Sequence, residues 1–441
     1  MAEVKVQLRS RVTCPHCWHR FAPEDVLWVA AHPDLNNDPR LGPDQQLRFL
    51  PTRFTIEGNA LDPRGLPCQE LACPQCHLSV PRAVLEMAPL FTSIAGSPSC
   101  GKSYFLASMT WRLRQVLAEK FAMTFSDADL VSNRILNQYE EDQFLNPNQD
   151  ALVRLAKTEE QGDLYDTVRY GDQVVTYPRP FLFLLRPAKA HPRFHDARKL
   201  SRLVCLYDNA GESFQPGKDT LANPVTRHLA YSNVLFFCFD PTQDPRFRRA
   251  CQGKTEDVQV TRSTVTARQE ILLNEIADRV RKYTGLQHTQ RHTRPLVVIV
   301  TKYDAWWPLL GVERLPDPFV APSNGSGPWG LNLPLVQETS DQVRKLLQKF
   351  APELTSAAEG FARNVLYVPV SATGRGPEVD PATGQVGVRP RDIKPMWCET
   401  PMLAALAGWV GGLVPYLKKS SNSERADARP AIVNAGSPDG V

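Results

Sequence analysis

The chain lacks a strong excess of charge of either sign. Its 441 residues include 51 Lys and Arg against 47 Asp and Glu, which leaves a formal net charge of +4. A protein that tracks the phosphates of DNA or RNA usually carries a pronounced basic excess. We therefore expect protein partners and no nucleic acid.

The chain also lacks a hydrophobic run long enough to cross a bilayer. Its longest apolar stretch, residues 402–417, is broken by glycines and a proline and falls short of the roughly 20 residues that a span needs. We expect a buried helix there. Residues 1–12 show no apolar signal core, which favours a cytoplasmic protein without a membrane span. Its ten cysteines would then be thiols or metal ligands, not disulfides.

What is present is an alternation of apolar runs and helical patterns. Hydrophobic residues make up 42% of the chain, enough to bury a core. Helical spacing marks residues 103–120, 265–283 and 339–350. The pattern predicts an α/β fold with a doubly wound, mostly parallel sheet covered on both faces. The predicted strands are residues 90–95, 181–185, 203–207, 234–239, 296–300 and 365–370.

Composition divides the chain into three regions. Residues 1–89 carry paired cysteines and long polar loops, residues 90–418 carry the α/β pattern, and residues 419–441 have little to bury and are expected to be disordered. Two stretches of the middle region look inserted. Residues 118–177 are mixed polar and helical without a strong strand. Residues 308–334 are proline-rich and predict an exposed loop. We expect Trp306 and Trp307, at its start, and Trp329, near its end, to pack onto the domain.

Residues 96–103 read GSPSCGKS, which fits the pattern G-x-x-x-x-G-K-[ST]. A predicted strand precedes this loop and a predicted helix follows it, so its backbone N–H groups would face phosphates at a helix N-terminus. Lys102 would reach the β- and γ-phosphates, and the Ser103 hydroxyl would bind Mg²⁺. The predicted phosphate-binding residues are Gly96, Ser97, Ser99, Cys100, Gly101, Lys102, Ser103 and Tyr104.

Three further motifs follow at the ends of predicted strands. In DNAGE (208–212), Asp208 is suited to hold Mg²⁺ and the Gly211 N–H to bind a γ-phosphate. In TKYD (301–304), the Asp304 carboxylate matches the N1–H and N2–H₂ donors of guanine, and the Lys302 stem can cover the ring. The last motif, SAT, comprises Ser371, Ala372 and Thr373, and its Ala372 N–H could donate to guanine O6.

These four motifs, in this order, resemble those of the translation-factor-related and Ras-like class of P-loop GTPases. The resemblance covers residues 90–417 and implies phosphates at GSPSCGKS and guanine between TKYD and SAT. It implies GTP, GDP and Mg²⁺ as ligands, with Thr301, Lys302 and Asp304 near the base. An ATP-using enzyme stays open, because the phosphate loop does not select the base. The layout also loosely resembles GTPases of bacterial conflict and defence systems.

The chain departs from that class at several positions. Lys102 and Asp208 lie 106 residues apart, more than a minimal domain needs. The best candidate for the switch threonine that binds Mg²⁺ is Thr176, with Thr167 in reserve. Glu212 stands where the class often has a water-positioning glutamine. No arginine finger is identifiable, with Arg169, Arg179 and a partner protein all open, so we expect slow intrinsic hydrolysis.

Two C-P-x-C pairs in the first region predict a structural zinc site with Cys14, Cys17, Cys73 and Cys76 as ligands. The pairs resemble zinc-ribbon knuckles, although the 55 residues between them exceed the usual gap of about 15 to 20. A redox pair or unliganded thiols are alternatives. The possible substitute ligands are Cys68, His16, His19 and His77.

Together these patterns predict a GTPase that acts as a nucleotide-dependent switch in a multiprotein assembly. Lys102, Ser103, Thr176, Asp208, Gly211 and Glu212 form its predicted catalytic set. A scaffold that binds nucleotide without hydrolysing it is the rival hypothesis.

Overall fold

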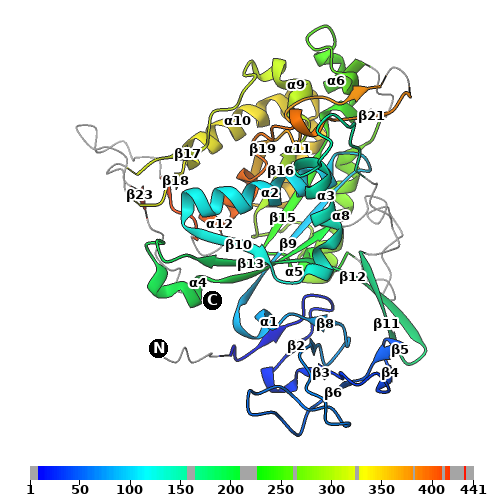
Figure 1. Ribbon diagram of the computed structural model, residues 1–441. Coiled ribbons are helices and arrows are strands. Elements are labelled where there is room, and N and C mark those ends of the chain that lie inside the picture. Colours follow the sequence, from blue (N-terminus) through cyan, green and yellow to red (C-terminus); the bar gives the residue numbers. More distant parts are fainter. Residues whose placement is uncertain are drawn as a thin grey trace.

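The computed structural model describes residues 8–155, 164–208, 226–261, 266–322, 327–380, 383–409, 413–417 and 432–433. A seven-stranded sheet forms its centre (Figure 1), in the order β10–β13–β14–β9–β15–β16–β19. The strands are β9 (Ala88–Gly96), β10 (Met123–Asp127), β13 (Phe181–Pro187), β14 (Arg202–Asp208), β15 (Val234–Phe239), β16 (Leu296–Val300) and β19 (Val365–Pro369).

Six of these strands are the six predicted apolar runs, so the α/β prediction is confirmed. The five strands from β14 to β19 are parallel, whereas β13 and β10 add two antiparallel pairings at one edge. From β9 the chain continues to β14 on one side and then crosses to β15 on the other. The carboxyl end of β9 is therefore a topological switch point, where open α/β sheets bind ligands.

Alternate residues of the strands point to opposite faces of the sheet and belong to two separate hydrophobic cores. In β15, Val234, Phe236 and Cys238 join one core, and Leu235, Phe237 and Phe239 join the other. The first core includes residues of α2 (Lys102–Phe121), α3 (Leu130–Phe144), α4 (Ala197–Leu200), α10 (Leu333–Phe350) and α12 (Thr400–Gly408). The second core receives α6 (Pro245–Cys251), α8 (Gln269–Thr284), α9 (Tyr303–Leu310) and α11 (Pro352–Phe361).

The cysteine-rich region packs on the second face of the sheet at β13 and β14, next to α5 (His228–Tyr231) (Figure 1). Leu182 and Tyr207 from the sheet share one core with Trp18 and Leu71 from this region. We call residues 8–87 the N-terminal module. Its elements are β1 (Val12–Thr13), β2 (Arg20–Phe21), β3 (Leu27–Val29), β4 (Asn36–Asp38), β5 (Gly42–Gln46), β6 (Arg48–Phe49), β7 (Leu71–Ala72), β8 (Ser79–Val80) and α1 (Ala83–Glu86).

The stretch 118–177 contains strands that the sequence did not predict. After α2 come β10 and α3, and then a hairpin of β11 (Tyr165–Tyr170) and β12 (Gln173–Pro178). Buried and exposed residues alternate along β10 because it lies at the sheet edge, so it lacks the continuous apolar run of the inner strands. The absence of a strong strand here was a wrong prediction. The hairpin packs into the core that the N-terminal module shares with the sheet.

The proline-rich stretch 308–334 is more ordered than a loop. It starts within α9 and includes β17 (Phe319–Val320) and β18 (Gly330–Leu331), which pairs with β22 (Tyr416–Leu417). Trp306 is fully buried, and the Lys120 ammonium lies 3.9 Å from the centroid of the Trp329 ring. The predicted packing of these tryptophans is confirmed.

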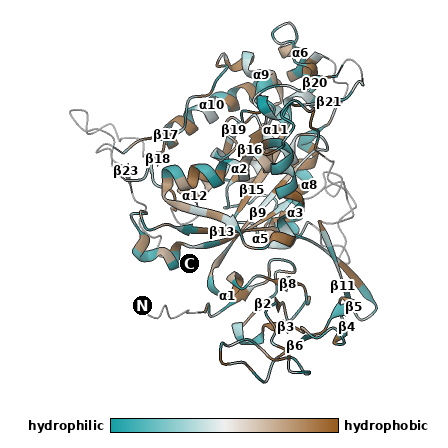
Figure 2. Ribbon diagram, in the orientation of Figure 1, coloured by the Kyte–Doolittle hydropathy of each residue, from teal (hydrophilic) through white to brown (hydrophobic). Residues whose placement is uncertain are grey.

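Figure 2 colours the chain by hydropathy, and the inner strands β15 and β16 consist of hydrophobic residues alone, VLFFCF and LVVIV. Within the described residues, no helix has both the length and the apolar character to cross a membrane. The expected C-terminal helix is α12, which is buried along most of its length.

Candidate functional site

The GSPSCGKS loop joins β9 to α2, as its motif requires. Gly96 packs so closely on β15 that a Cβ there would lie 2.6 Å from the Cys238 carbonyl oxygen. Gly101 precedes α2 with φ of 94°, which glycine adopts without strain. The Lys102 ammonium is buried and donates to the carbonyls of Gly96 and Ser97 at 3.0 and 3.1 Å. The loop therefore curls around a lysine at a helix N-terminus, an arrangement suited to anions.

Polar side chains from neighbouring strand ends hold this loop from behind. The Ser97 hydroxyl donates to Gln243 Oε1 at 2.8 Å, and Gln243 Nε2 donates to the Pro98 carbonyl at 3.0 Å. The Thr301 hydroxyl donates to the Cys100 carbonyl at 2.9 Å. The Ser97 hydroxyl and the buried Cys100 thiol thus face protein, which leaves the backbone of these two residues to meet a ligand.

Lys302 is fixed beside the loop by an ion pair that the sequence did not reveal. Its ammonium lies 2.6 Å from Oδ2 of the buried Asp240, which follows β15. Burial acts to lower the pKa of Lys302, but the Asp240 carboxylate outweighs it and the net pKa is raised. Lys302 itself has φ of 56° at the start of α9. Its position is therefore set by both backbone and charge.

Asp304 meets the SAT motif directly. The Ser371 hydroxyl donates to Asp304 Oδ1, and the Gly374 N–H donates to the Ser371 hydroxyl at 2.8 Å. Gln259 Nε2 lies 3.4 Å from the second carboxylate oxygen. Burial raises the pKa of Asp304 to about 6. The carboxylate is therefore oriented, partly dehydrated and poised to ionise near neutral pH.

The three motifs surround one cavity of about 540 Å³ at the carboxyl end of the sheet. Ser99 and Gly101 come from the phosphate loop, Lys302 and Asp304 from TKYD, and Ala372 from SAT. Cavities of this size accommodate small-molecule ligands and cofactors. The lining is Ser99, Gly101, Tyr104, Phe105, Arg154, Gln259, Thr301, Lys302, Asp304, Val370, Ala372, Thr373, Pro377, Val386, Gly387 and Val388.

The predicted catalytic residues that the structure describes lie outside this lining. Asp208 is buried at the end of β14, where it pairs in register with Ile94 of β9, and Ser103 lies in the first turn of α2. Gly211 and Glu212 fall outside the described residues. Thr176 and Thr167 face each other as partners in the β11–β12 hairpin, and neither lines the cavity.

The two candidate arginines belong to the same hairpin region. Arg179 forms a two-pronged ion pair with Asp166, at 3.1 and 2.5 Å. The Arg169 N–H donates to the Arg40 carbonyl of the N-terminal module at 2.8 Å. Both arginines therefore serve contacts around the module, and neither lines the cavity.

A second candidate site consists of the four predicted cysteines. The thiols of Cys14, Cys17, Cys73 and Cys76 all lie within 4.8 Å of one another. Two of the separations are 3.8 and 3.7 Å. A tetrahedron of sulfurs about 2.3 Å from a zinc ion has edges of about 3.8 Å. The donor set and its spacing therefore fit a closed, structural metal site.

The two cysteine pairs form matching turns. The residue after each pair, Trp18 or His77, has positive φ and donates its N–H to the first cysteine of that pair. The backbone N–H groups of His16 and Gln75 point at the sulfurs of Cys14 and Cys73, at 3.3 and 3.4 Å. Such donors stabilise thiolate charge, which a bound cation requires.

The substitute ligands all have other contacts. His77 pairs with Asp38 at 2.8 Å, and His16 lies 3.1 Å from the Ser79 carbonyl. His19 stacks on Phe21. The Cys68 thiol points toward the Leu66 carbonyl and is absent from the cluster. The geometry therefore favours the four paired cysteines over these substitutes.

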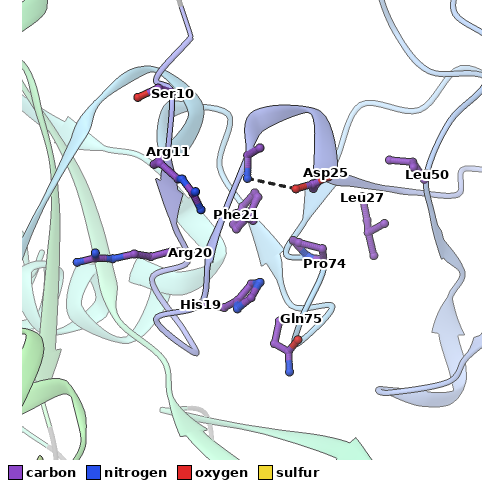
Figure 3. A pocket seen from close by; sticks show the side chains of 11 residues that line it. Ser10, Arg11, His19, Arg20, Phe21, Asp25, Leu27, Leu50, Pro74 and Gln75 are labelled. Carbon is purple, nitrogen blue, oxygen red and sulfur yellow. Dashed lines mark hydrogen bonds between the residues drawn. The ribbon is translucent and has the colours of Figure 1, made fainter.

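A larger hollow, about 820 Å³, opens on the surface of the N-terminal module (Figure 3). Arg11, His19 and Phe21 lie on one side of it and Leu27 and Leu50 on the other. Its lining includes Pro74 and Gln75 of the second cysteine pair but no residue of the phosphate loop. The Asp25 carboxylate beside it accepts from the Ala22 N–H at 3.3 Å. This hollow is separate from the cavity that the motifs surround.

No family model matches the chain. A curated relative, "Putative ESX-1 scaffolding and assembly protein SaeC" of Mycolicibacterium smegmatis, is 25% identical over 170 residues, which cover 38% of this chain and 37% of that protein. The chain thus spans little more than a third of that relative.

Three solved structures show a faint likeness. Sup35 complexed with GDP matches with a TM-score of 0.23 and 13% identity over 65% of this chain and 38% of that chain. The Saccharomyces cerevisiae Ski7 GTPase-like domain bound to GTP matches with a TM-score of 0.25 and 11% identity, over 65% of this chain and 43% of that chain. The Chaetomium thermophilum SRb-GTP/SRX complex matches with a TM-score of 0.25 and 12% identity, over 66% of this chain and 94% of that chain. Scores this low fall short of showing a common fold.

Sequence reasoning missed several residues of the site. Asp240 carries the same signal as Asp208 and Asp304, a carboxylate close to the end of an apolar strand, and could have been found that way. Gln259 and Arg154 lie in segments without a strand or helix pattern. Only the tertiary structure brings them to the cavity.

Proposed function

We propose that this protein binds GTP and hydrolyses it to GDP and phosphate. The observation that carries the proposal is the single cavity lined by the phosphate loop, TKYD and SAT. These motifs are distant in sequence and their convergence at a sheet switch point suits a nucleotide. The base would sit against Asp304 and Ala372, and the phosphates would extend toward the N-terminus of α2.

Asp304 would select guanine. Its two oxygens would accept from the N1–H and N2–H₂ groups, a donor pair that adenine does not have. The hydroxyl of Ser371 holds the carboxylate in place, and the Lys302 stem, anchored by Asp240, would cover one face of the ring. If the ligand were ATP, its adenine would offer no such donor pair to the buried Asp304 carboxylate, so we favour GTP.

Lys102 and the loop N–H groups would stabilise charge on the β- and γ-phosphates. The ammonium now donates to Gly96 and Ser97 carbonyls and would exchange these for phosphate oxygens, which are stronger acceptors. Ser103 and Asp208 would hold Mg²⁺, which supplies electrostatic stabilisation when bound. Thr176 remains a candidate for the same ion, and Glu212 for orienting water. Without an arginine finger we expect slow intrinsic turnover.

The four cysteines would hold a structural Zn²⁺. Burial raises the pKa of the Cys14 and Cys76 thiols, so a divalent cation would have to displace their protons. Metal binding would then contribute free energy of folding to the N-terminal module.

We further propose that nucleotide binding switches contacts with protein partners in a multiprotein assembly. The curated relative is described as a scaffolding and assembly protein, and the low net charge of the chain favours protein over nucleic acid.

The test is equilibrium binding and phosphate release by the purified protein with GTP, GDP and ATP. Lys102→Ala should weaken GTP binding by at least about ten-fold, while Lys345→Ala, on the polar surface of α10, should bind normally. Asp304→Asn should lose guanine and gain xanthine, because an amide replaces one acceptor by a donor. Tight GTP binding without phosphate release would indicate the non-hydrolysing scaffold, and equal binding of ATP would overturn the base assignment.

A further inference from the structure

The cavity is closed by two segments that belong to none of the motifs. One is the short stretch 152–155, and the other is the hairpin of β20 (Glu378–Val379) and β21 (Val386–Gly387) with Val388 after it. Val153 and Val388 exchange two backbone hydrogen bonds of 3.0 Å. A Cβ on Gly387 would lie 2.7 Å from the Val153 carbonyl oxygen. The two segments are therefore closely and reciprocally joined.

The stretch 152–155 is also tied to the phosphate-loop helix. The Leu155 N–H donates to the Tyr104 hydroxyl at 3.0 Å, and Tyr104 lies in the first turn of α2. Arg154 stands between the two anchored residues, Val153 and Leu155. Its backbone is consequently fixed from both sides, next to the N-terminus of α2.

Arg154 brings a solvent-exposed positive charge to the cavity lining. Within the described part of the chain, no carboxylate forms an ion pair with it. The one acid of the lining, Asp304, is engaged by Ser371 and Gln259 at the base side. Burial raises the pKa of the Tyr104 hydroxyl, and the charge of Arg154 acts in the opposite direction, in keeping with a guanidinium close to Tyr104.

We propose that Arg154 binds the α- or β-phosphate of the nucleotide. A guanidinium forms paired, charge-assisted hydrogen bonds with phosphate oxygens. Arg154 shares the cavity with Ser99, Gly101 and Tyr104, whereas Lys102, Ser103 and Asp208 at the proposed Mg²⁺ end are outside its lining. Arg154 therefore binds the α- or β-phosphate, which GDP and GTP have in common, and not the γ-phosphate. The inference rests on the proposed function, because it concerns the same nucleotide.

The test compares Arg154→Ala and Arg154→Lys with the wild type in equilibrium binding of GDP and of GTP. Arg154→Ala should weaken both nucleotides by a similar factor of about ten or more, and Arg154→Lys should recover part of the loss. Arg64→Ala, on an exposed turn of the N-terminal module, is the matched control and should bind both nucleotides normally.

Two outcomes would overturn the inference. Unchanged affinity of both Arg154 variants would remove Arg154 from the site, and a slower single turnover with unchanged GDP affinity would make it a γ-phosphate residue instead. A wild-type protein that binds no guanine nucleotide would reject the proposed function itself, so the two failures are distinguishable. The salt dependence of GDP binding is a second readout, since loss of one phosphate contact should make it shallower for Arg154→Ala.

Discussion

The indole N–H of Trp18 donates to the Tyr207 hydroxyl at 3.0 Å, across 189 residues of sequence. Trp18 directly follows Cys17 of the cysteine cluster, and Tyr207 directly precedes Asp208. The Tyr207 hydroxyl in turn donates to the Pro15 carbonyl at 2.5 Å, and Trp18 stacks on Tyr231 of α5 (His228–Tyr231). The cysteine cluster is therefore packed against the strand that ends in the proposed Mg²⁺ ligand.

Metal binding should depend on the four clustered cysteines and not on the other cysteines of the chain. Cys73→Ser should lose the zinc that we expect in the wild type at one ion per chain, because a serine hydroxyl stays protonated and binds zinc poorly. Elemental analysis of the purified proteins measures this. Cys68→Ser, in the same module but outside the cluster, is the control and should keep one ion. Equal zinc in both variants would rule out the cluster as the site.

The contact between Trp18 and Tyr207 should stabilise the whole protein. Trp18→Phe removes the donor and leaves a small cavity, so the free energy of unfolding should fall by roughly 1 to 3 kcal/mol. Chemical denaturation would give the value. Trp409→Phe changes a partly exposed tryptophan and should cost much less. If the two substitutions cost the same, the module does not depend on this contact.

Guanine nucleotide affinity should fall in mild acid. Burial raises the pKa of the Asp304 carboxyl to about 6, and only the ionised form offers acceptors to both guanine donors. Affinity should therefore be nearly complete above about pH 7, fall to about half at pH 6 and be about ten-fold lower at pH 5. Titration of GDP affinity between pH 5 and 8 tests this. A flat profile would mean that Asp304 does not contact the base.

The Asp240 carboxylate should stabilise the protein through its ion pair with Lys302. Asp240→Asn leaves the Lys302 ammonium without its 2.6 Å partner and should cost roughly 2 to 4 kcal/mol of stability. In a Lys302→Met background the same change should cost far less, which a double-mutant cycle measures. Equal costs in both backgrounds would show that the Asp240 carboxylate acts through its hydrogen bonds with the N–H and hydroxyl of Thr242 instead.

The inner strands were predictable because burial on both faces makes them continuous apolar runs. LVCLYD and VLFFCF are examples, and both lie in the sheet. The edge strand β10 escaped prediction because one side of it meets solvent, so its apolar residues alternate with polar ones. The β11–β12 hairpin escaped because the module that covers it lies far away in sequence.

The residues of the two candidate sites likewise fall into those that a local sequence pattern predicts and those that only the fold brings together. Ligand spacing within a few residues predicted Cys14, Cys17, Cys73 and Cys76, and the structure brings these four thiols together. No local pattern signals that Trp18 reaches Tyr207 or that Arg154 reaches the cavity, because these contacts arise only when distant segments fold together. Whether Thr176 binds Mg²⁺ stays a prediction.

Equilibrium binding of GDP and ADP to the purified protein tests the central claim most directly. Because a buried acceptor pair rejects a ligand that lacks the matching donors, GDP should bind at least about a hundred-fold more tightly than ADP. Asp304→Asn, with a thermal unfolding curve close to that of the wild type, should abolish the difference. Equal affinity for the two nucleotides, or no binding of either, would contradict the assignment of the cavity to guanine nucleotide.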